Sequence, residues 1–244
     1  MDGENFLKRI GARLHSLRYA LIAQGLLAGL GSGVVVILFR AALERADALR
    51  GTVLAFCRTH VWAVPLLLIG LALAALAVSA LLRWEPYISG SGIPQVEGEL
   101  KDEICQVWWR VLAAKLAGGI ISIGCGLSLG REGPSIQLGA MAGKGTACLL
   151  HRKRPDKAAE KHLLACGASA GLAAAFNAPL AGVLFALEEL HGRFSPEILL
   201  SSMASSITAD YLSRQVFGLA PVFDFGVLEE AIPLRCYGHV ILLG

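Results

Sequence analysis

Charged residues are scarce in this chain. Asp, Glu, Lys and Arg together make up 17% of its 244 residues, whereas 55% are hydrophobic. Soluble domains usually carry about 25% charged residues, and the mean hydropathy here is +0.60. This composition excludes an ordinary soluble domain and predicts an all-α membrane protein, because helices satisfy every backbone hydrogen bond internally.

The chain also lacks the patterns of several functional classes. Its formal net charge is only +3 and no basic stripe is interleaved with aromatics, so we expect no nucleic-acid partner. No nucleophile, base and orienting group recur together, which argues against an enzyme. The six cysteines form no CxxC pair, and we interpret them as small packing residues, with no metal or cofactor site. They are Cys57, Cys105, Cys125, Cys148, Cys166 and Cys236.

The apolar runs define the organisation of the chain. We expect an interfacial amphipathic helix at residues 1–18, a transmembrane helical repeat at 19–217, and a loop with the start of a further segment at 218–244. A polar connecting loop with a helical start is expected at 40–60. The glycines at 25, 29 and 33, and again at 139 and 143, predict close helix packing. The positive-inside rule places the N-terminus, with its basic residues, in the cytoplasm of a multi-pass protein of the cell membrane.

One motif stands out between two apolar segments, namely Gly130-Arg131-Glu132-Gly133-Pro134. A carboxylate in a membrane segment is a candidate functional residue, because its cost must be offset by pairing, hydration or protonation. Proline and the flanking glycines suit the first turn of a helix, whose exposed amides form an anion site. The alternative is a simple turn, in which Arg131 and Glu132 pair near the membrane surface.

Two further motifs have the same character. Ser91 lies in Gly90-Ser91-Gly92-Ile93-Pro94, where its hydroxyl either caps a helix or donates to an anion beside the amides. Asn177-Ala178-Pro179 breaks an apolar stretch into two half-helices. The second half runs into Glu188 and Glu189, which either mark the exit into water or carry protons. Broken helices in a membrane protein indicate a transporter with its binding site near the midplane.

Taken together, these motifs resemble the N-terminal half of the CLC family of chloride channels and chloride/proton exchangers. The resemblance rests on residues 90–94, 130–134 and 171–189, and it implies a bundle of tilted, broken and re-entrant helices, the first of two inverted repeats. It also implies that chloride and protons are the transported ions, that the lipid bilayer surrounds the chain, and that the chain forms a homodimer.

The resemblance assigns roles to individual residues. Ser91 is similar to the serine that coordinates the central chloride, and Glu132 to the gating glutamate. Glu189 resembles the internal proton-transfer glutamate of the exchangers, with Glu188 helping to hydrate the proton path. The surrounding anion-binding backbone comprises Gly92, Ile93, Gly130, Arg131 and Gly133.

The second repeat of the family, with its Gly-x-Phe-x-Pro motif and tyrosine, does not occur in these 244 residues. We therefore expect chloride/proton antiport by a protein of which this chain is one half, needing the missing C-terminal half. A passive chloride channel and a non-transporting half-pore are the alternatives.

Overall fold

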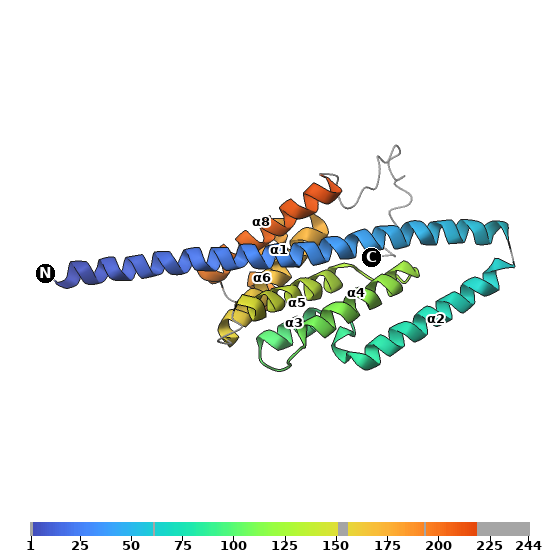
Figure 1. The fold of residues 1–244 in the computed structure, drawn as a ribbon, viewed down its shortest axis with the longest axis horizontal. Coiled ribbons are helices and arrows are strands. Elements are labelled where there is room, and N and C mark those ends of the chain that lie inside the picture. Colours follow the sequence, from blue (N-terminus) through green and yellow to red (C-terminus); the bar gives the residue numbers. More distant parts are fainter. Residues whose placement is uncertain (1, 61, 151–155, 193, 219–244) are drawn as a thin grey trace, which may run out of the picture.

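The structure is a computed structural model that describes residues 2–60, 62–150, 156–192 and 194–218, with side chains from Tyr19 onward. Every regular element in these ranges is helical (Figure 1). The elements are α1 (Asp2–Thr59), α2 (Ala63–Trp84), the 3-10 turn η1 (Pro86–Ile88), α3 (Ile93–Leu100), α4 (Trp108–Gly124), α5 (Glu132–Leu150), α6 (Lys157–Phe176), α7 (Pro179–Phe185), the π-helical turn η2 (Ala186–His191) and α8 (Pro196–Phe217).

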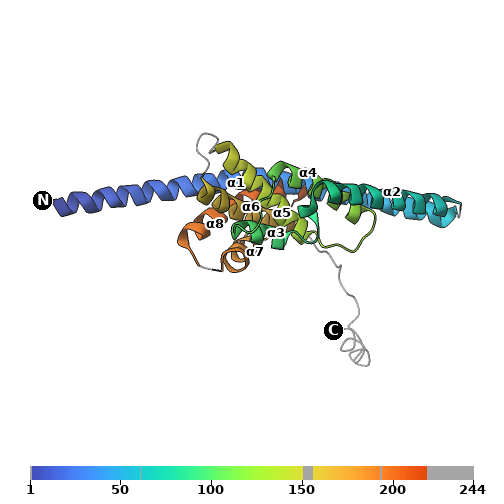
Figure 2. The same cartoon turned by 90° about the horizontal axis from the view of Figure 1, so that it is seen from below.

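Helix α1 is a single helix of 58 residues along the whole length of the molecule (Figures 1 and 2). The predicted loop at 40–60 is wrong, and the backbone has no break at the predicted boundary between residues 18 and 19. The physical reason is that no proline occurs before Pro65. The polar residues instead pair within the helix, as where Arg40 Nε lies 3.3 Å from Glu44 Oε1.

Close packing of α1 on α8 follows the glycine spacing. A Cβ atom added to Gly25 would lie 2.5 Å from the carbonyl oxygen of Ser201, and one added to Gly29 would lie 2.9 Å from the Cα atom of Ser205. Gly33 meets the same face of α8 one turn later. The prediction of a close-packing face on this helix is confirmed, because any side chain there would separate the two backbones.

The centre of the fold is the pair formed by α5 and α6. A Cβ atom on Gly139 would lie 2.8 Å from the Cα atom of Gly171, and one on Gly143 would lie 3.0 Å from that of Gly167. The second predicted glycine pair is thus confirmed as well. Most side chains of both helices are buried, so the two helices form a rigid base for the segments that surround them.

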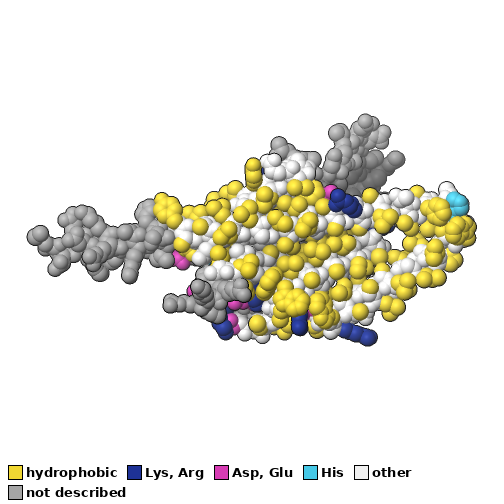
Figure 3. All heavy atoms as spheres, viewed as in Figure 1, with side chains coloured by type: hydrophobic (Ala, Val, Ile, Leu, Met, Phe, Trp, Pro, Cys, Tyr) yellow, Lys and Arg dark blue, Asp and Glu magenta, His cyan; other side chains and the backbone are white. Residues whose placement is uncertain are grey.

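The periphery of the molecule is apolar. Two stretches in the described residues are long and hydrophobic enough to cross a membrane, Tyr19–Thr59 with 41 residues and Ala63–Trp84 with 22. Hydrophobic side chains cover most of the face in Figure 3, and the few charged ones lie toward its margins. An apolar cavity of about 1220 Å³ separates α2 from the C-terminal part of α1. This surface suits lipid contact.

The break predicted at Asn177-Ala178-Pro179 is present, between α6 and α7. Helix α6 ends at Phe176, Asn177 adopts a left-handed conformation with φ 53°, and α7 starts at Pro179. Asn177 Oδ1 accepts hydrogen bonds from Arg40 Nη1 at 3.3 Å and from Ser213 Oγ at 3.0 Å. The Asn177 side chain is therefore held from α1 and α8, and Arg214 Nη2 of α8 donates to the Asn177 carbonyl oxygen at 3.2 Å.

Candidate functional site

The first two sequence motifs meet at a cavity of about 540 Å³. Ser91 and Ile93 line it from one side, and Gly130, Glu132 and Gly133 line it from the other. These two segments are about forty residues apart in the chain, and the structure brings them together because α5 packs beside α3 and its preceding loop. The cavity therefore contains five of the predicted site residues.

Helix α5 begins at Glu132, as the motif predicts. Its first turn is marked by the hydrogen bond from the Ser135 amide to the carbonyl oxygen of Arg131, at 3.1 Å. The amides at the start of a helix have no partner within the helix, and the positive end of the helix dipole lies there. The start of this 19-residue helix can therefore hold an anion, and Glu132, its first residue, is exposed and lines the same cavity.

Ser91 makes the capping contact that the sequence allowed, and its hydroxyl proton faces no obstacle to the other proposed role. Its Oγ accepts a weak hydrogen bond from the amide of Ile93 at 3.4 Å, which is a local capping contact. A hydroxyl that accepts a bond still has its proton to donate. Ser91 is exposed and lines the cavity, so this proton is available to an anion there.

The two motifs touch through their backbones. A Cβ atom added to Gly133 would lie 2.8 Å from the carbonyl carbon and 2.9 Å from the Cα atom of Ser91. Real Cβ atoms do not approach this closely, so only glycine permits the contact. The role of Gly133 is therefore to let the loop that carries Ser91 lie directly on the start of α5.

Lys115 is a cavity residue that the sequence analysis did not single out. It belongs to α4 and is buried, and its Nζ donates to the carbonyl oxygens of Ile88 and Gly90, at 2.9 Å each. The ammonium group thus carries positive charge at the rim of the cavity and fastens the loop before Ser91. The signal that could have revealed it was a lysine within the apolar run from Val107 to Leu129.

Two of the predicted anion-binding residues lie outside this lining. Gly92 has φ +101° and packs against the side chain of Gln137. The guanidinium of Arg131 lies 5.9 Å from the centre of the Phe176 ring. Both residues adjoin the site, and the structure gives them backbone and packing roles.

Glu188 and Glu189 also lie outside the cavity. Both belong to η2, the π-helical turn after α7, and both side chains are exposed. The structure therefore separates the Glu132 carboxyl group, on the cavity, from the pair at the end of the broken helix. Single π-helical turns occur frequently at functional sites.

Among the residues described, no group of three His, Cys, Asp or Glu side chains could hold a metal ion.

Comparison with known proteins identifies the family of the chain. A family model described as voltage gated chloride channel matches residues 70–244. The H⁺/Cl⁻ exchange transporter ClcA of Cronobacter sakazakii is 39% identical over 224 residues, which is 89% of this chain and 47% of the relative. ClcA of Salmonella paratyphi B is 37% identical over 92% of this chain and 48% of its own length. The chain thus spans about half the length of the curated relatives it matches.

Solved structures share the fold. The crystal structure of a slow cyanobacterial Cl⁻/H⁺ antiporter matches with a TM-score of 0.76 and 33% identity, over 91% of this chain and 52% of the other. A CLC-type fluoride/proton antiporter matches with a TM-score of 0.65 and 24% identity, over 92% of this chain and 53% of the other. The predicted bundle of tilted and broken helices is confirmed.

Proposed function

Because the chain belongs to the voltage-gated chloride channel (CLC) family, we propose that it forms the anion-binding half of a chloride/proton antiporter. The observation that carries this proposal is the cavity in which the Ser91 hydroxyl, the start of α5 and the Glu132 carboxylate meet. A chloride ion and a carboxylate compete for the same amides, and protonation of the carboxylate removes the competitor. This competition links the movement of the two ions.

Glu132 is the proposed gate and Ser91 the chloride ligand. Glu189 is the proposed proton-transfer group on the other side of the membrane, and Glu188 keeps that path hydrated. Their exposure on η2 supports this role, because a group that collects protons from water must reach it. Chloride and protons are the only ions that this mechanism requires, with no further cofactor.

The proposed assembly is a homodimer in the cell membrane, with a cytoplasmic N-terminus and a second inverted repeat completing each pore. Large apolar side chains on α7 and α8 support the dimer. Leu180, Ile207 and Tyr211 are 68%, 54% and 61% exposed. Apolar exposure on this scale suits either a subunit interface or lipid.

The test is chloride efflux from liposomes containing this chain together with the second repeat that completes the proposed pore, recorded together with proton uptake. We expect chloride efflux that drives proton uptake. Glu132→Gln should keep chloride movement but lose proton coupling, since the neutral amide resembles the protonated gate. Glu189→Gln should reduce proton uptake and spare chloride. Equal loss of both fluxes in each variant would contradict the assigned roles.

The same recording separates the alternatives. A passive channel would move chloride without proton uptake, before any substitution is made. A non-transporting half-pore would show neither flux although the chain is inserted and helical by circular dichroism. Either result would overturn the antiport proposal for this chain.

A further inference from the structure

Four residues, 87–90, precede Ser91 in the chain. The backbone carbonyl oxygen of each accepts a hydrogen bond from a side chain. The donors are two glutamine amides and one ammonium group, each at 2.9 Å: Gln137 Nε2 to Tyr87 O, Lys115 Nζ to Ile88 O and to Gly90 O, and Gln95 Nε2 to Ser89 O. A carbonyl oxygen carries partial negative charge and repels an anion. Hydrogen bonding to these donors offsets the partial negative charge of the four oxygens and leaves the loop to present its hydroxyl and amides.

Gln137 is the donor that connects this loop to α5. Its side chain is fully buried, and its second Nε2 hydrogen bond goes to Gln106 Oε1 at 3.0 Å. Its own Oε1 has no hydrogen-bond partner and lies against Gly92, where an added Cβ atom would come within 2.6 Å. One amide therefore holds the carbonyl of Tyr87 and contacts the backbone at the start of α3.

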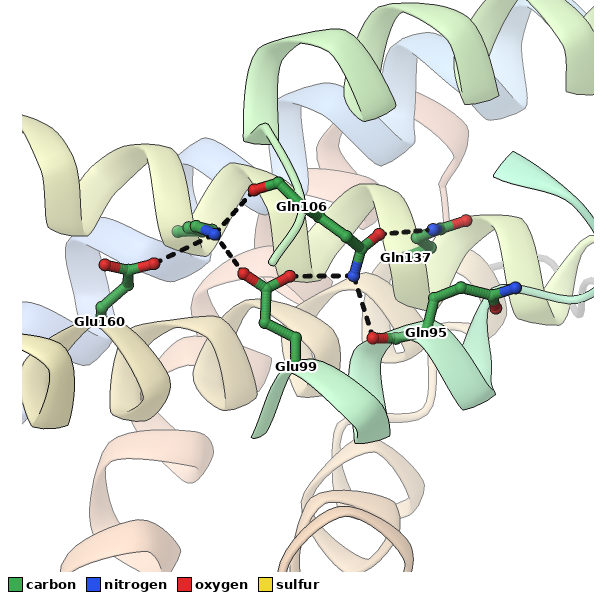
Figure 4. A network of polar contacts seen from close by, with 6 residues as sticks. Gln95, Glu99, Gln106, Gln137 and Glu160 are labelled. Atoms are coloured by element: carbon green, nitrogen blue, oxygen red, sulfur yellow. Dashed lines mark hydrogen bonds and ion pairs between the residues drawn. The ribbon is translucent and has the colours of Figure 1, made fainter. Parts of the chain in front are cut away.

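The hydrogen bonds of Gln106 determine the orientation of the Gln137 amide (Figure 4). Gln106 Nε2 donates to Glu99 Oε2 and to the carbonyl oxygen of Gln95, at 2.9 Å each. Both partners are acceptors, so Gln106 must direct Nε2 toward them and Oε1 toward Gln137. Gln137 must then present its own Nε2, which brings its second N–H to Tyr87.

A buried ion pair anchors this chain of hydrogen bonds. The Lys144 ammonium donates to Glu99 Oε1, to the carbonyl oxygen of Gln106 at 2.7 Å, and lies 3.1 Å from Glu160 Oε1. All three N–H donors of the lysine are thus used. Glu99 and Lys144 are 7% and 5% exposed, and a buried pair with full hydrogen bonding holds one arrangement.

We propose that Gln137 is a positioning residue for the anion site, oriented by the Glu99, Lys144 and Gln106 network that joins α3, α5 and the segment before α4. Its function is to hold the Tyr87 carbonyl away from the cavity and the Gly92 backbone in place, so that the Ser91 loop binds anions. This inference rests on the proposed anion binding at that cavity and concerns binding alone, without any need for transport.

The experiment is titration calorimetry of chloride into the purified full chain in detergent. The buffer contains a large organic anion in place of chloride. Gln137→Met keeps the volume and removes both N–H donors. Loss of one net hydrogen bond at the loop corresponds to about tenfold weaker chloride binding. Gln137→Asn, whose amide is one methylene too short to reach both partners, should weaken binding in the same direction and serves if the methionine variant does not fold.

Two controls separate positioning from general stability. Thr146→Val removes a hydrogen bond within α5 that goes to Ala142, 2.9 Å away, and should leave chloride affinity unchanged. Glu99→Gln should weaken chloride binding by itself but add little in a Gln137→Met background, because both act through one amide. A structural defect alone would lower the unfolding temperature without this dependence.

The outcomes distinguish this inference from the proposed function. Chloride binding by the unmodified chain, together with unchanged affinity in a folded Gln137→Met variant, would overturn the positioning role and leave the anion site intact. No binding by the unmodified chain would overturn the anion site and, with it, this inference. Weakened binding in Gln137→Met with normal helicity by circular dichroism would support both.

Discussion

Substituting Gly133 by alanine tests the contact on which the anion site depends. The added methyl would lie 2.8 Å from the carbonyl carbon of Ser91 and 2.9 Å from its Cα atom. Carbon atoms in good contact are about 3.5–4.0 Å apart, so the two backbones would have to separate by roughly 0.6–1 Å. The atoms involved are backbone, so no side-chain rotation can relieve the clash.

The loop has little freedom to move. Lys115 holds the carbonyl oxygens of Ile88 and Gly90, and overpacking of this kind costs about 1–3 kcal/mol. Displacing the Ser91 hydroxyl from an anion at the start of α5 would weaken a charge-assisted hydrogen bond worth about 1.5–3 kcal/mol. We therefore expect Gly133→Ala to reduce chloride affinity by about tenfold or more, measured by titration calorimetry.

Gly130 provides the matched control within the same motif. A Cβ atom there meets nothing within 4 Å, and the residue is not among the glycines with positive φ. Gly130→Ala keeps the backbone amide, so we expect chloride affinity within about twofold of the unmodified chain, far below one net hydrogen bond. Unchanged binding in Gly133→Ala, or equal losses in both variants, would refute the reasoning.

Two further predictions concern stability. Gly139→Ala would force α5 from the backbone of α6 and should lower the thermal unfolding temperature, whereas Gly70→Ala on α2, with nothing within 4 Å, should leave it unchanged or raise it slightly through helix propensity. Asn177→Ala and Asn177→Gly both lose the hydrogen bonds from Arg40 and Ser213. Alanine keeps a Cβ atom at φ 53°, whereas glycine adopts this conformation without strain. Asn177→Ala should therefore lower the unfolding temperature more than Asn177→Gly. Equal melting temperatures of the two Asn177 variants would contradict this account.

Local signals in the sequence predicted the ends of several elements. Pro134 and Pro179 each lie in the first turn of a helix, and Asn177 ends one, because proline and left-handed conformations restrict the backbone whatever surrounds them. The spacing of the small residues also predicted which faces of α1 and α5 pack closely. These inferences need only local chemistry, and the structure agrees with them.

Partners across the chain could not be predicted in this way. The glycine face of α1 packs on α8, about 175 residues later, and nothing at Gly25 identifies Ser201. The polar residues at 40–60 indicated a loop. In the structure they form ion pairs within α1, Arg40 with Glu44 and Asp47 with Arg50, so they are compatible with a helix. The sequence alone shows Lys144 only as a charge near the end of an apolar stretch, because its partners Glu99 and Glu160 come from two other elements.

The arrangement explains how a membrane segment tolerates Glu132. A carboxylate in a membrane segment must be compensated, and Glu132 lines a cavity to which the start of α5 and Lys115 also belong. The same compensation is available to a chloride ion once the carboxylate is neutral or has moved away. Under the proposed function the site takes one negative charge, and carboxylate and chloride compete for it. Coupling between an anion and a proton needs no more than this competition, provided that the Ser91 loop keeps its carbonyls turned aside.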